Sequence, residues 1–205
     1  MSWILTTSFL CSACGYHVDD SGVVSHFPTI SVPYFSGDQD GTLTDAVIKG
    51  LSTSGEFTYV NGGGAVILEG AVISDNFEHI GYQYDRHHVS GVRINRLVPN
   101  EGRREITVRI SLIDSLSQKV IYGPFDISAS SDYDFVDSDS LQDTSFIDPA
   151  GMRQSVLFFS LGQLDSSEGA HAMARFPVHE RLATKIVEGL SNLPYNVDSS
   201  YIKEQ

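Results

Sequence analysis

The chain has 205 residues, of which 41% are hydrophobic, and this is enough for one globular domain with a sizeable core. Its formal net charge of -13 argues against a nucleic-acid partner, because phosphate backbones are bound by clustered Lys and Arg. The only cysteines, Cys11 and Cys14, lie near the N-terminus, so the sequence offers no disulfide framework for the rest of the chain.

Residues 1–13 carry an apolar run without any charged residue, which is typical of the hydrophobic region of a signal peptide. The run is shorter than the roughly 20 apolar residues that span a bilayer. Ser12 and Ala13 precede Cys14 and resemble the lipobox of bacterial lipoproteins, in which the cysteine thiol carries diacylglycerol. We therefore expect a signal peptide over 1–13, a mature chain over 14–205 and lipid on Cys14. The alternative, a redox or metal-binding C-x-x-C motif, lacks further cysteine ligands.

The first part of the mature chain contains both strand and helix signals. The β-branched and aromatic residues of Thr29–Phe35 predict a strand, and Pro33, which lacks an N–H, predicts that it lies at a sheet edge. Apolar residues at helical spacing predict a helix over Leu43–Leu51, with Thr42 as its N-cap and Gly55 as its end. Further strand signals occur at 57–60 and 65–73, on either side of a glycine turn at 62–64.

The middle of the chain predicts an antiparallel hairpin. Apolar and polar residues alternate over Ile106–Leu112, which indicates a strand with one buried face. A turn at 114–118 separates it from a second strand over 120–127. Six aspartates within Ser131–Asp148, with little apolar periodicity, predict an acidic surface loop.

The C-terminal part predicts two helices. One covers Met152–Leu164, and Pro177 opens the other, because proline is favoured in the first turn of a helix. The second helix carries an apolar stripe of Leu182, Ile186, Leu190 and Leu193. The order of elements implies a single α+β domain, a two-layer sandwich whose mixed, mostly antiparallel sheet has the helices packed on one face.

The sequence contains no recognisable catalytic motif. His179-Glu180 begins like the helix of a zinc protease, but Ala183 stands where the second metal ligand would be. The pair His87-His88 has no evident third ligand, and no G-x-S-x-G motif occurs. We therefore expect no enzymatic activity, no metal and no cofactor.

Basic residues gather in one segment of this acidic chain. The positions from Arg86 to Arg109 hold six arginines and two glutamates, which is a local formal charge of +4. Arginine suits phosphate groups because its planar guanidinium donates two parallel hydrogen bonds. We take four of these arginines as candidate contacts to lipopolysaccharide or to an acidic protein wall: Arg93, Arg96, Arg103 and Arg104. The alternative is a solvated rim around a hairpin loop, which keeps sheet edges from aggregating.

The order of these elements resembles the LPS-assembly lipoprotein family (LptE) of Gram-negative outer membranes. The segments that carry the resemblance are Ala13-Cys14-Gly15-Tyr16-His17, Thr29–Phe35, the helix over Leu43–Leu51, Leu68-Glu69-Gly70, Ile80–Asp85 and the helix over Leu182–Leu193. Together they cover nearly the whole mature chain.

The resemblance implies a two-layer α/β domain held by lipid at the periplasmic face of the outer membrane. It implies that the domain plugs the β-barrel translocon protein (LptD-like), helps to assemble it and contacts lipopolysaccharide during insertion. A lipoprotein subunit or solute-binding module of another envelope secretion or lipid-transport complex is the alternative.

Overall fold

The computed structural model describes residues 29–87, 90–137, 145–155 and 167–193. The expected signal peptide and Cys14 lie outside these ranges. The strands are β1 (Thr29–Ser31), β2 (Thr58–Tyr59), β3 (Val66–Arg86), β4 (Arg93–Asp114), β5 (Val120–Asp134), β6 (Ser145–Ile147) and β7 (Arg153–Ser155). The helices are α1 (Thr42–Ser54) and α2 (Ser167–Ser191).

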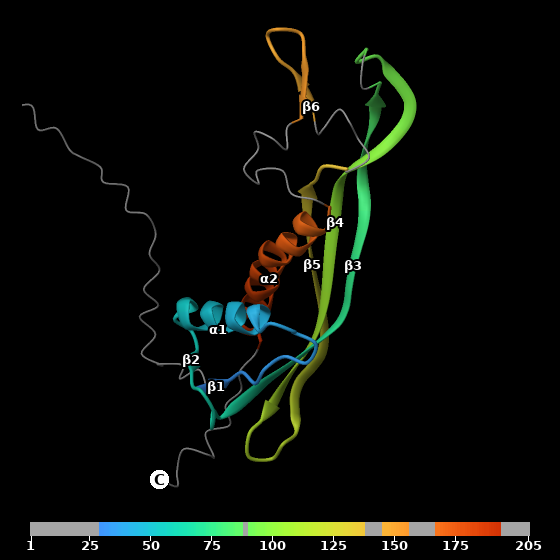
Figure 1. Ribbon diagram of the computed structural model, residues 1–205. Helices are drawn as coiled ribbons and strands as arrows, with labels where there is room; N and C mark the ends of the chain where they lie inside the picture. Colours follow the sequence, from blue (N-terminus) through green and yellow to red (C-terminus); the bar gives the residue numbers. More distant parts are fainter. Residues whose placement is uncertain (1–28, 88–89, 138–144, 156–166, 194–205) are drawn as a thin grey trace, which may run out of the picture.

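The main sheet has five strands in the order β2-β1-β3-β4-β5, and β6 pairs with β7 separately. β1 pairs parallel with β2 and β3, because α1 carries the chain across from β1 to β2. β3, β4 and β5 form an antiparallel meander. Figure 1 shows both helices on one side of this sheet, and the β3–β4 hairpin runs far beyond them. The predicted α+β class, with helices on one face of a mixed sheet, is confirmed.

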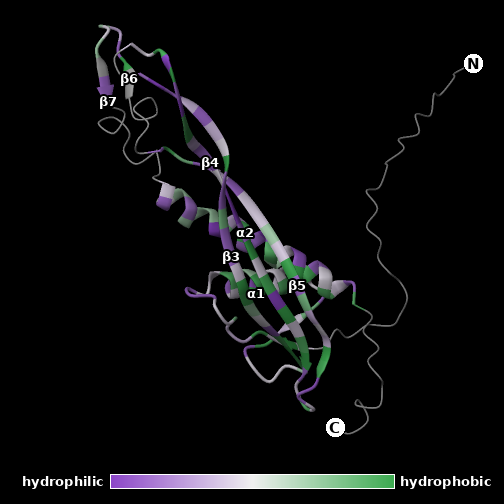
Figure 2. Cartoon of the chain, turned by 90° about the vertical axis from the view of Figure 1, so that its right-hand side faces the viewer, coloured by the Kyte–Doolittle hydropathy of each residue, from purple (hydrophilic) through white to green (hydrophobic). Residues whose placement is uncertain are grey.

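The core lies between the helices and the proximal part of the sheet. Ile106, Val108 and Ile110 on β4 are buried, whereas Arg109 between them is exposed. From α2, the apolar stripe contributes Leu182, Ile186 and Leu190, all 2% exposed or less. Figure 2 shows the hydrophobic residues concentrated in the part of the sheet that the helices cover. The distal half of the hairpin therefore contributes much less to this core.

α1 begins where a buried carboxylate holds its first turn. The Asp38 carboxylate accepts hydrogen bonds from the backbone N–H of Thr44 (2.8 Å) and from its hydroxyl (2.7 Å). The N-cap is Gly41 at φ 77°, and Thr42, predicted as the cap, is the first helical residue. Gly55, with φ 72°, ends the helix as predicted, since glycine adopts this left-handed conformation at little cost.

The prediction that the first strand lies at a sheet edge is wrong. β1 is only three residues long and lies between β2 and β3, so β2 forms that edge. Pro33 lies two residues beyond the end of β1, so its missing N–H does not affect the pairing of this strand. The first strand therefore ends earlier than its β-branched and aromatic composition suggested.

The predicted antiparallel hairpin of 106–112 with 120–127 is confirmed as part of the β4–β5 pairing. β3 and β4 form a second hairpin that the sequence did not predict, with 21 and 22 residues in its two strands. Ser131–Asp134, predicted as the start of the acidic loop, form the end of β5 instead. Residues 138–144 of the predicted loop lie outside the described residues.

Both C-terminal helix predictions need correction at their starts. Met152 and the three residues of β7 occupy the beginning of the predicted 152–164 helix, and 156–166 lie outside the described residues. Pro177 lies inside α2 rather than at its first turn, because the helix already begins at Ser167. Pro177 is exposed, so the ring sits on the solvent side of the helix.

Candidate functional site

The distal part of the β3–β4 hairpin carries an aromatic cluster next to the N-terminal end of α2. Ring centroids lie 5.1–6.1 Å apart around a closed circuit of five side chains: Phe77, His79, Phe135, Tyr133 and His171. Gly102 lies beside it, and a Cβ there would approach Tyr133 Cζ to 2.6 Å. Sequence periodicity could not reveal this cluster, because its members come from three elements and the segment after β5.

Arg103 and Arg104 point to opposite faces of the sheet, because successive strand residues alternate. Arg104 lies on the helix side, where it donates two hydrogen bonds to the Asp75 carboxylate (2.9 and 2.6 Å) and one to the His171 carbonyl (2.9 Å). Arg103 lies on the outer face and donates to both carboxylate oxygens of Asp132 (2.6 and 2.9 Å). This bond holds the pKa of the Asp132 carboxyl below its usual value.

Arg93 and Arg96 lie nearer the tip of the hairpin. The Arg93 guanidinium carbon is 3.4 Å from the centroid of the Tyr84 ring, a stacked cation–π contact. Arg96 Nη1 lies 3.7 Å from a carboxylate oxygen of the buried Asp85. The four candidate arginines therefore do not form one patch: two lie near the tip, and two lie in the strand body on opposite faces with short contacts to acids.

The outer face of the sheet, which carries no helix, is polar. Arg109 donates to both oxygens of Asp126 (2.7 and 2.8 Å), repeating the Arg103–Asp132 arrangement further along the same two strands. Both ion pairs are about half exposed, so their contribution to stability is small. They leave charged groups exposed on this face.

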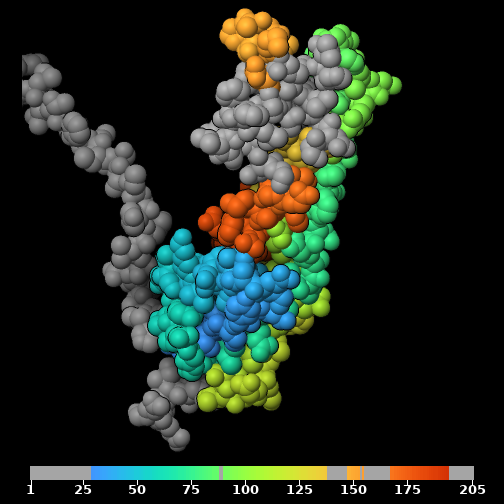
Figure 3. Space-filling view, in the orientation of Figure 1, coloured from blue at the N-terminus to red at the C-terminus, as the bar shows by residue number. Residues whose placement is uncertain are grey.

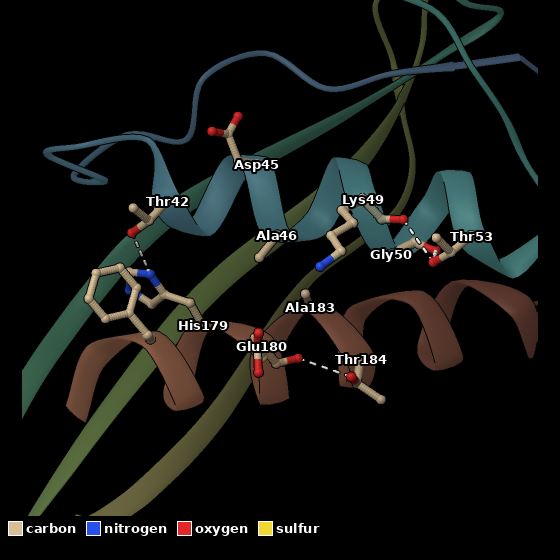
Figure 4. A pocket seen from close by; sticks show the side chains of 11 residues that line it. Thr42, Asp45, Ala46, Lys49, Gly50, Thr53, His179, Glu180, Ala183 and Thr184 are labelled. Atoms are coloured by element: carbon tan, nitrogen blue, oxygen red, sulfur yellow. Dashed lines mark hydrogen bonds between the residues drawn. The ribbon is translucent and has the colours of Figure 1, made fainter. Parts of the chain in front are cut away.

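A groove of about 510 Å³ lies between α1 and α2 on the side away from the sheet (Figure 4). Ala46, Gly50 and Ala183 form its floor, and a Cβ at Gly50 would come within 3.1 Å of Val187. These small residues let the two helices approach closely, and in Figure 3 the atoms of α1 lie directly against those of α2. His179, also in the groove, is buried, and burial lowers its pKa below the usual value.

Within the described ranges, no group of three or more potential metal ligands comes together. His179 lies in the helix as predicted, but it bonds to Thr42 rather than to a metal-ligand partner. His87 closes the end of the hairpin through its backbone bonds with Val92 and Gly91. No helix in this part of the chain is long and apolar enough to cross a membrane.

No protein-family model matches the sequence, and no curated protein is significantly similar to it. Several solved structures are similar to the chain. A minor lipoprotein from Acinetobacter baumannii is 14% identical, with a TM-score of 0.44 over 80% of this chain and 90% of that one. The rare lipoprotein B from Shewanella oneidensis is 15% identical, with a TM-score of 0.41 over 80% and 93% of the two chains. An uncharacterized lipoprotein B from Nitrosomonas europaea is 10% identical, with a TM-score of 0.41 over 81% and 86%. All three are bacterial lipoproteins by name, and at these values the likeness does not extend to a function.

Proposed function

We propose that this chain is an outer-membrane lipoprotein, held by lipid on Cys14 at the periplasmic face, that acts by binding and not as an enzyme. Its role is to plug and help assemble the β-barrel translocon for lipopolysaccharide and to assist lipopolysaccharide insertion. The lipobox-like Ser12-Ala13-Cys14 and the resemblance to the LPS-assembly lipoproteins support this proposal.

The structural observation that carries the proposal is the polar outer face of β3, β4 and β5. The lumen of an outer-membrane barrel is polar, so a domain that lies within it needs polar walls. In the stretch of β3 from Ser74 to Glu78 and opposite it on β4 and β5, the outer-face residues are polar and none is buried: Ser74, Asn76, Glu78, Arg103, Glu105, Thr107, Arg109, Asp126, Ser128, Ser130 and Asp132. The apolar residues Ile67 and Ile113 lie on this face only nearer the β4–β5 turn. A face of this kind needs no second layer of the same domain and can lie against a polar wall.

The candidate lipopolysaccharide contacts divide by geometry. Arg93 stacks its face on Tyr84, and the N–H groups of a stacked guanidinium point outward in the ring plane, where a phosphate can accept them. Arg96 is half exposed. Arg103 and Arg104 already donate to carboxylates, so a phosphate would have to compete with Asp132 or Asp75. We therefore place the phosphate contact at Arg93 and Arg96, with Arg103 and Arg104 as secondary contacts.

The test is co-purification through a C-terminal tag on the full chain, expressed in a Gram-negative cell and extracted from the envelope with mild detergent. Recovery of a large β-barrel protein with the bait is the expected result. A periplasmic or inner-membrane complex in its place would overturn the translocon role and favour another envelope machine.

A pair of variants tests whether the outer face makes the contact. Arg109→Glu reverses a charge on the outer face, and Lys49→Glu makes the same change on the exposed side of α1. We expect Arg109→Glu to lower the amount of barrel recovered more than Lys49→Glu does. Equal recovery would remove the outer face from the argument.

A further inference from the structure

The two edges of the antiparallel part of the sheet differ in whether other groups bind their backbone carbonyls. At the β5 edge, Lys185 of α2 donates to the Ser128 carbonyl at 2.7 Å, and Arg181 donates to the Ser130 carbonyl. These side chains occupy backbone acceptors that another strand would need. Such capping is one way in which proteins prevent edge-to-edge pairing.

The β3 edge has no such cover within the described residues. β1 pairs with β3 only at Val66 and Ile67, and the segment after β1 reaches Ala71 and Val72 through Ser36. From Ile73 onward, β4 is the only strand among the described residues that pairs with β3. α2 packs mainly over β4 and β5. It reaches β3 at its N-terminal end, where the His171 ring lies 5.1 Å from the Phe77 ring, and this contact lies on one face of the sheet and leaves the backbone edge of β3 open.

A regular stretch of backbone lies within this open edge. β3 has register shifts at Ile73, between Val72 and Ser74, and at Ile80, between His79 and Gly81. Between them, Ser74–His79 pair with β4 without irregularity. Phe77, in this stretch, is 58% exposed, which is unusual for a phenylalanine in a strand. An open edge with an exposed apolar side chain is a surface that pairs with another strand.

We propose that this edge pairs antiparallel with the same edge of a second copy of the chain, about a two-fold axis at Phe77. A two-fold axis perpendicular to the sheet keeps the helix side of both copies on the same side of the joined sheet. Each residue then lies opposite the partner residue that is the same number of positions from Phe77 in the other direction. In this register Phe77 faces the partner's Phe77. Asp75 faces the partner's His79, and Asn76 faces the partner's Glu78.

The side chains in this register are complementary to themselves. Two phenyl rings meet at the centre, an acid faces an imidazole on each side, and an amide faces a carboxylate on the outer face. Asp75 is 38% exposed beside Arg104, so its carboxylate retains accessible surface for the partner's His79. No pair of like charges lies directly opposite within 75–79, although each chain carries a net charge of -13.

The fold also limits how far the pairing extends. The segment around Ser36 occupies the β3 edge up to Val72, so the partner strand can lie beside residues 73–81 only. The register shifts near Gly81, one on each strand of the hairpin, bend the hairpin at that point. The dimer is therefore joined by one short central stretch, with the two hairpin tips diverging.

Disulfide cross-linking tests the register directly. Directly opposite residues of an antiparallel pair have Cα atoms about 4.5–5.5 Å apart, within the range of a disulfide. In the full chain with Cys11→Ser and Cys14→Ser, kept in mild detergent, Phe77→Cys should form a covalent dimer on mild oxidation. The control is Leu116→Cys, since Leu116 is 85% exposed at the β4–β5 turn and has no partner in the proposed dimer.

Sedimentation of the same full chain without an added cysteine provides the second measurement. Phe77→Lys should raise the dimer dissociation constant by roughly tenfold or more, because it removes the ring pair and places two like charges on the axis. Circular dichroism should show that the variant remains folded, although it loses the ring contacts of Phe77 with His79 and His171. Cross-linking of Phe77→Cys no faster than that of Leu116→Cys, or a parent chain that sediments only as a monomer, would overturn the proposal. Pairing of the two copies does not require the lipid anchor. A negative result in these experiments would therefore overturn the dimer proposal without affecting the proposed function.

Discussion

The Nδ1 atom of His179 lies 2.8 Å from the hydroxyl oxygen of Thr42, and this hydrogen bond joins α2 to the first turn of α1. The Thr42 hydroxyl has a single proton, which it donates to the Asp40 carboxylate at 2.8 Å. The imidazole must then be the donor, so His179 carries its proton on Nδ1. Asp40 also accepts from Arg175 (2.7 Å), which closes a chain of four polar groups between the two helices.

The burial of His179 predicts that the domain loses stability in mild acid. Its pKa is lowered chiefly by burial, although Asp38 and Asp40 oppose the shift. Below about pH 6.5 the His179 imidazole binds a proton more readily in the unfolded chain than in the folded chain. The free energy of unfolding therefore decreases as the pH is lowered. Urea denaturation at pH 7.5 and 5.5 measures this loss.

The control is His179→Asn, which keeps a donor near the Nδ1 position but cannot titrate. The pH dependence should be smaller in this variant than in the parent chain. Part of it should persist, because His171 also has a pKa lowered by burial and by Arg104. Identical pH dependence in the two proteins would show that His179 does not contribute.

The sequence predicted those helices and strands in which regularly spaced apolar residues form one buried face. Alternation over Ile106–Leu112 and the Leu182–Leu190 stripe identified the strand and helix that meet in the core. Periodicity did not predict the distal half of the hairpin, because both of its faces are largely exposed to solvent. Only the family resemblance gave Ile80–Asp85 as the end of a strand, and β3 does end at Arg86. The strands of the hairpin are fixed by pairing between distant residues, and a local pattern does not record such pairing.

The candidate site was less predictable than the fold. Four arginines close together in sequence were expected near one loop, but strand alternation separates Arg103 from Arg104, and 22 residues of β4 spread them along the hairpin. Their acidic partners Asp75 and Asp132 lie on other strands. A count of charges along the chain could not show these partners.

Two glycine substitutions should have opposite effects on stability. A Cβ on Gly70 would lie 2.5 Å from Phe35 Cδ2, and Phe35 is fully buried, so the ring cannot move into solvent. Gly70→Ala should therefore destabilise the domain by about 1–3 kcal/mol. Gly189 lies inside α2 with nothing within 4 Å of its Cβ position, so Gly189→Ala should stabilise by roughly 0.5–1 kcal/mol. Urea denaturation of both variants measures these changes, and equal signs would contradict the packing described.

A charge in the apolar stripe of α2 should unfold the domain. Leu190 is 2% exposed against the core, and Leu190→Asp would bury an unpaired carboxylate at a cost of roughly 3–5 kcal/mol. This is a large part of the about 5–15 kcal/mol that stabilises a typical domain. Thermal melting followed by circular dichroism measures the loss. Glu188→Ala, an exposed change two residues away, is the control and should melt like the parent chain.

Replacement of Cys14 should prevent lipid attachment. The thiolate of cysteine is the nucleophile that accepts the diacylglyceryl group, and a serine hydroxyl is too weak a nucleophile to replace it. Cells expressing the full chain should incorporate labelled palmitate into the parent protein and none into Cys14→Ser. Cys11→Ser is the matched control and should be labelled like the parent. Label in Cys14→Ser would remove the lipoprotein assignment.

Replacement of the two arginines near the hairpin tip should weaken capture of lipopolysaccharide. Arg93→Glu with Arg96→Gln removes the guanidinium stacked on Tyr84 and the one beside Asp85. Arg109→Glu changes charge on the same strand, but its guanidinium is already bonded to Asp126. We expect the tip variant to lose most of the capture and Arg109→Glu to retain it.

The measurement is retention of the full chain on immobilised lipopolysaccharide at low and high salt, with circular dichroism to verify folding. Salt should weaken the binding of the parent chain, because exposed charges at the tip are screened within about 10 Å at 0.1 M. Arg104→Glu is a poor test, because Arg104 is only 12% exposed and the new carboxylate would face Asp75 within the fold. Equal retention of the tip variant and the parent would assign these arginines to a solvated rim and leave lipopolysaccharide handling to other surfaces.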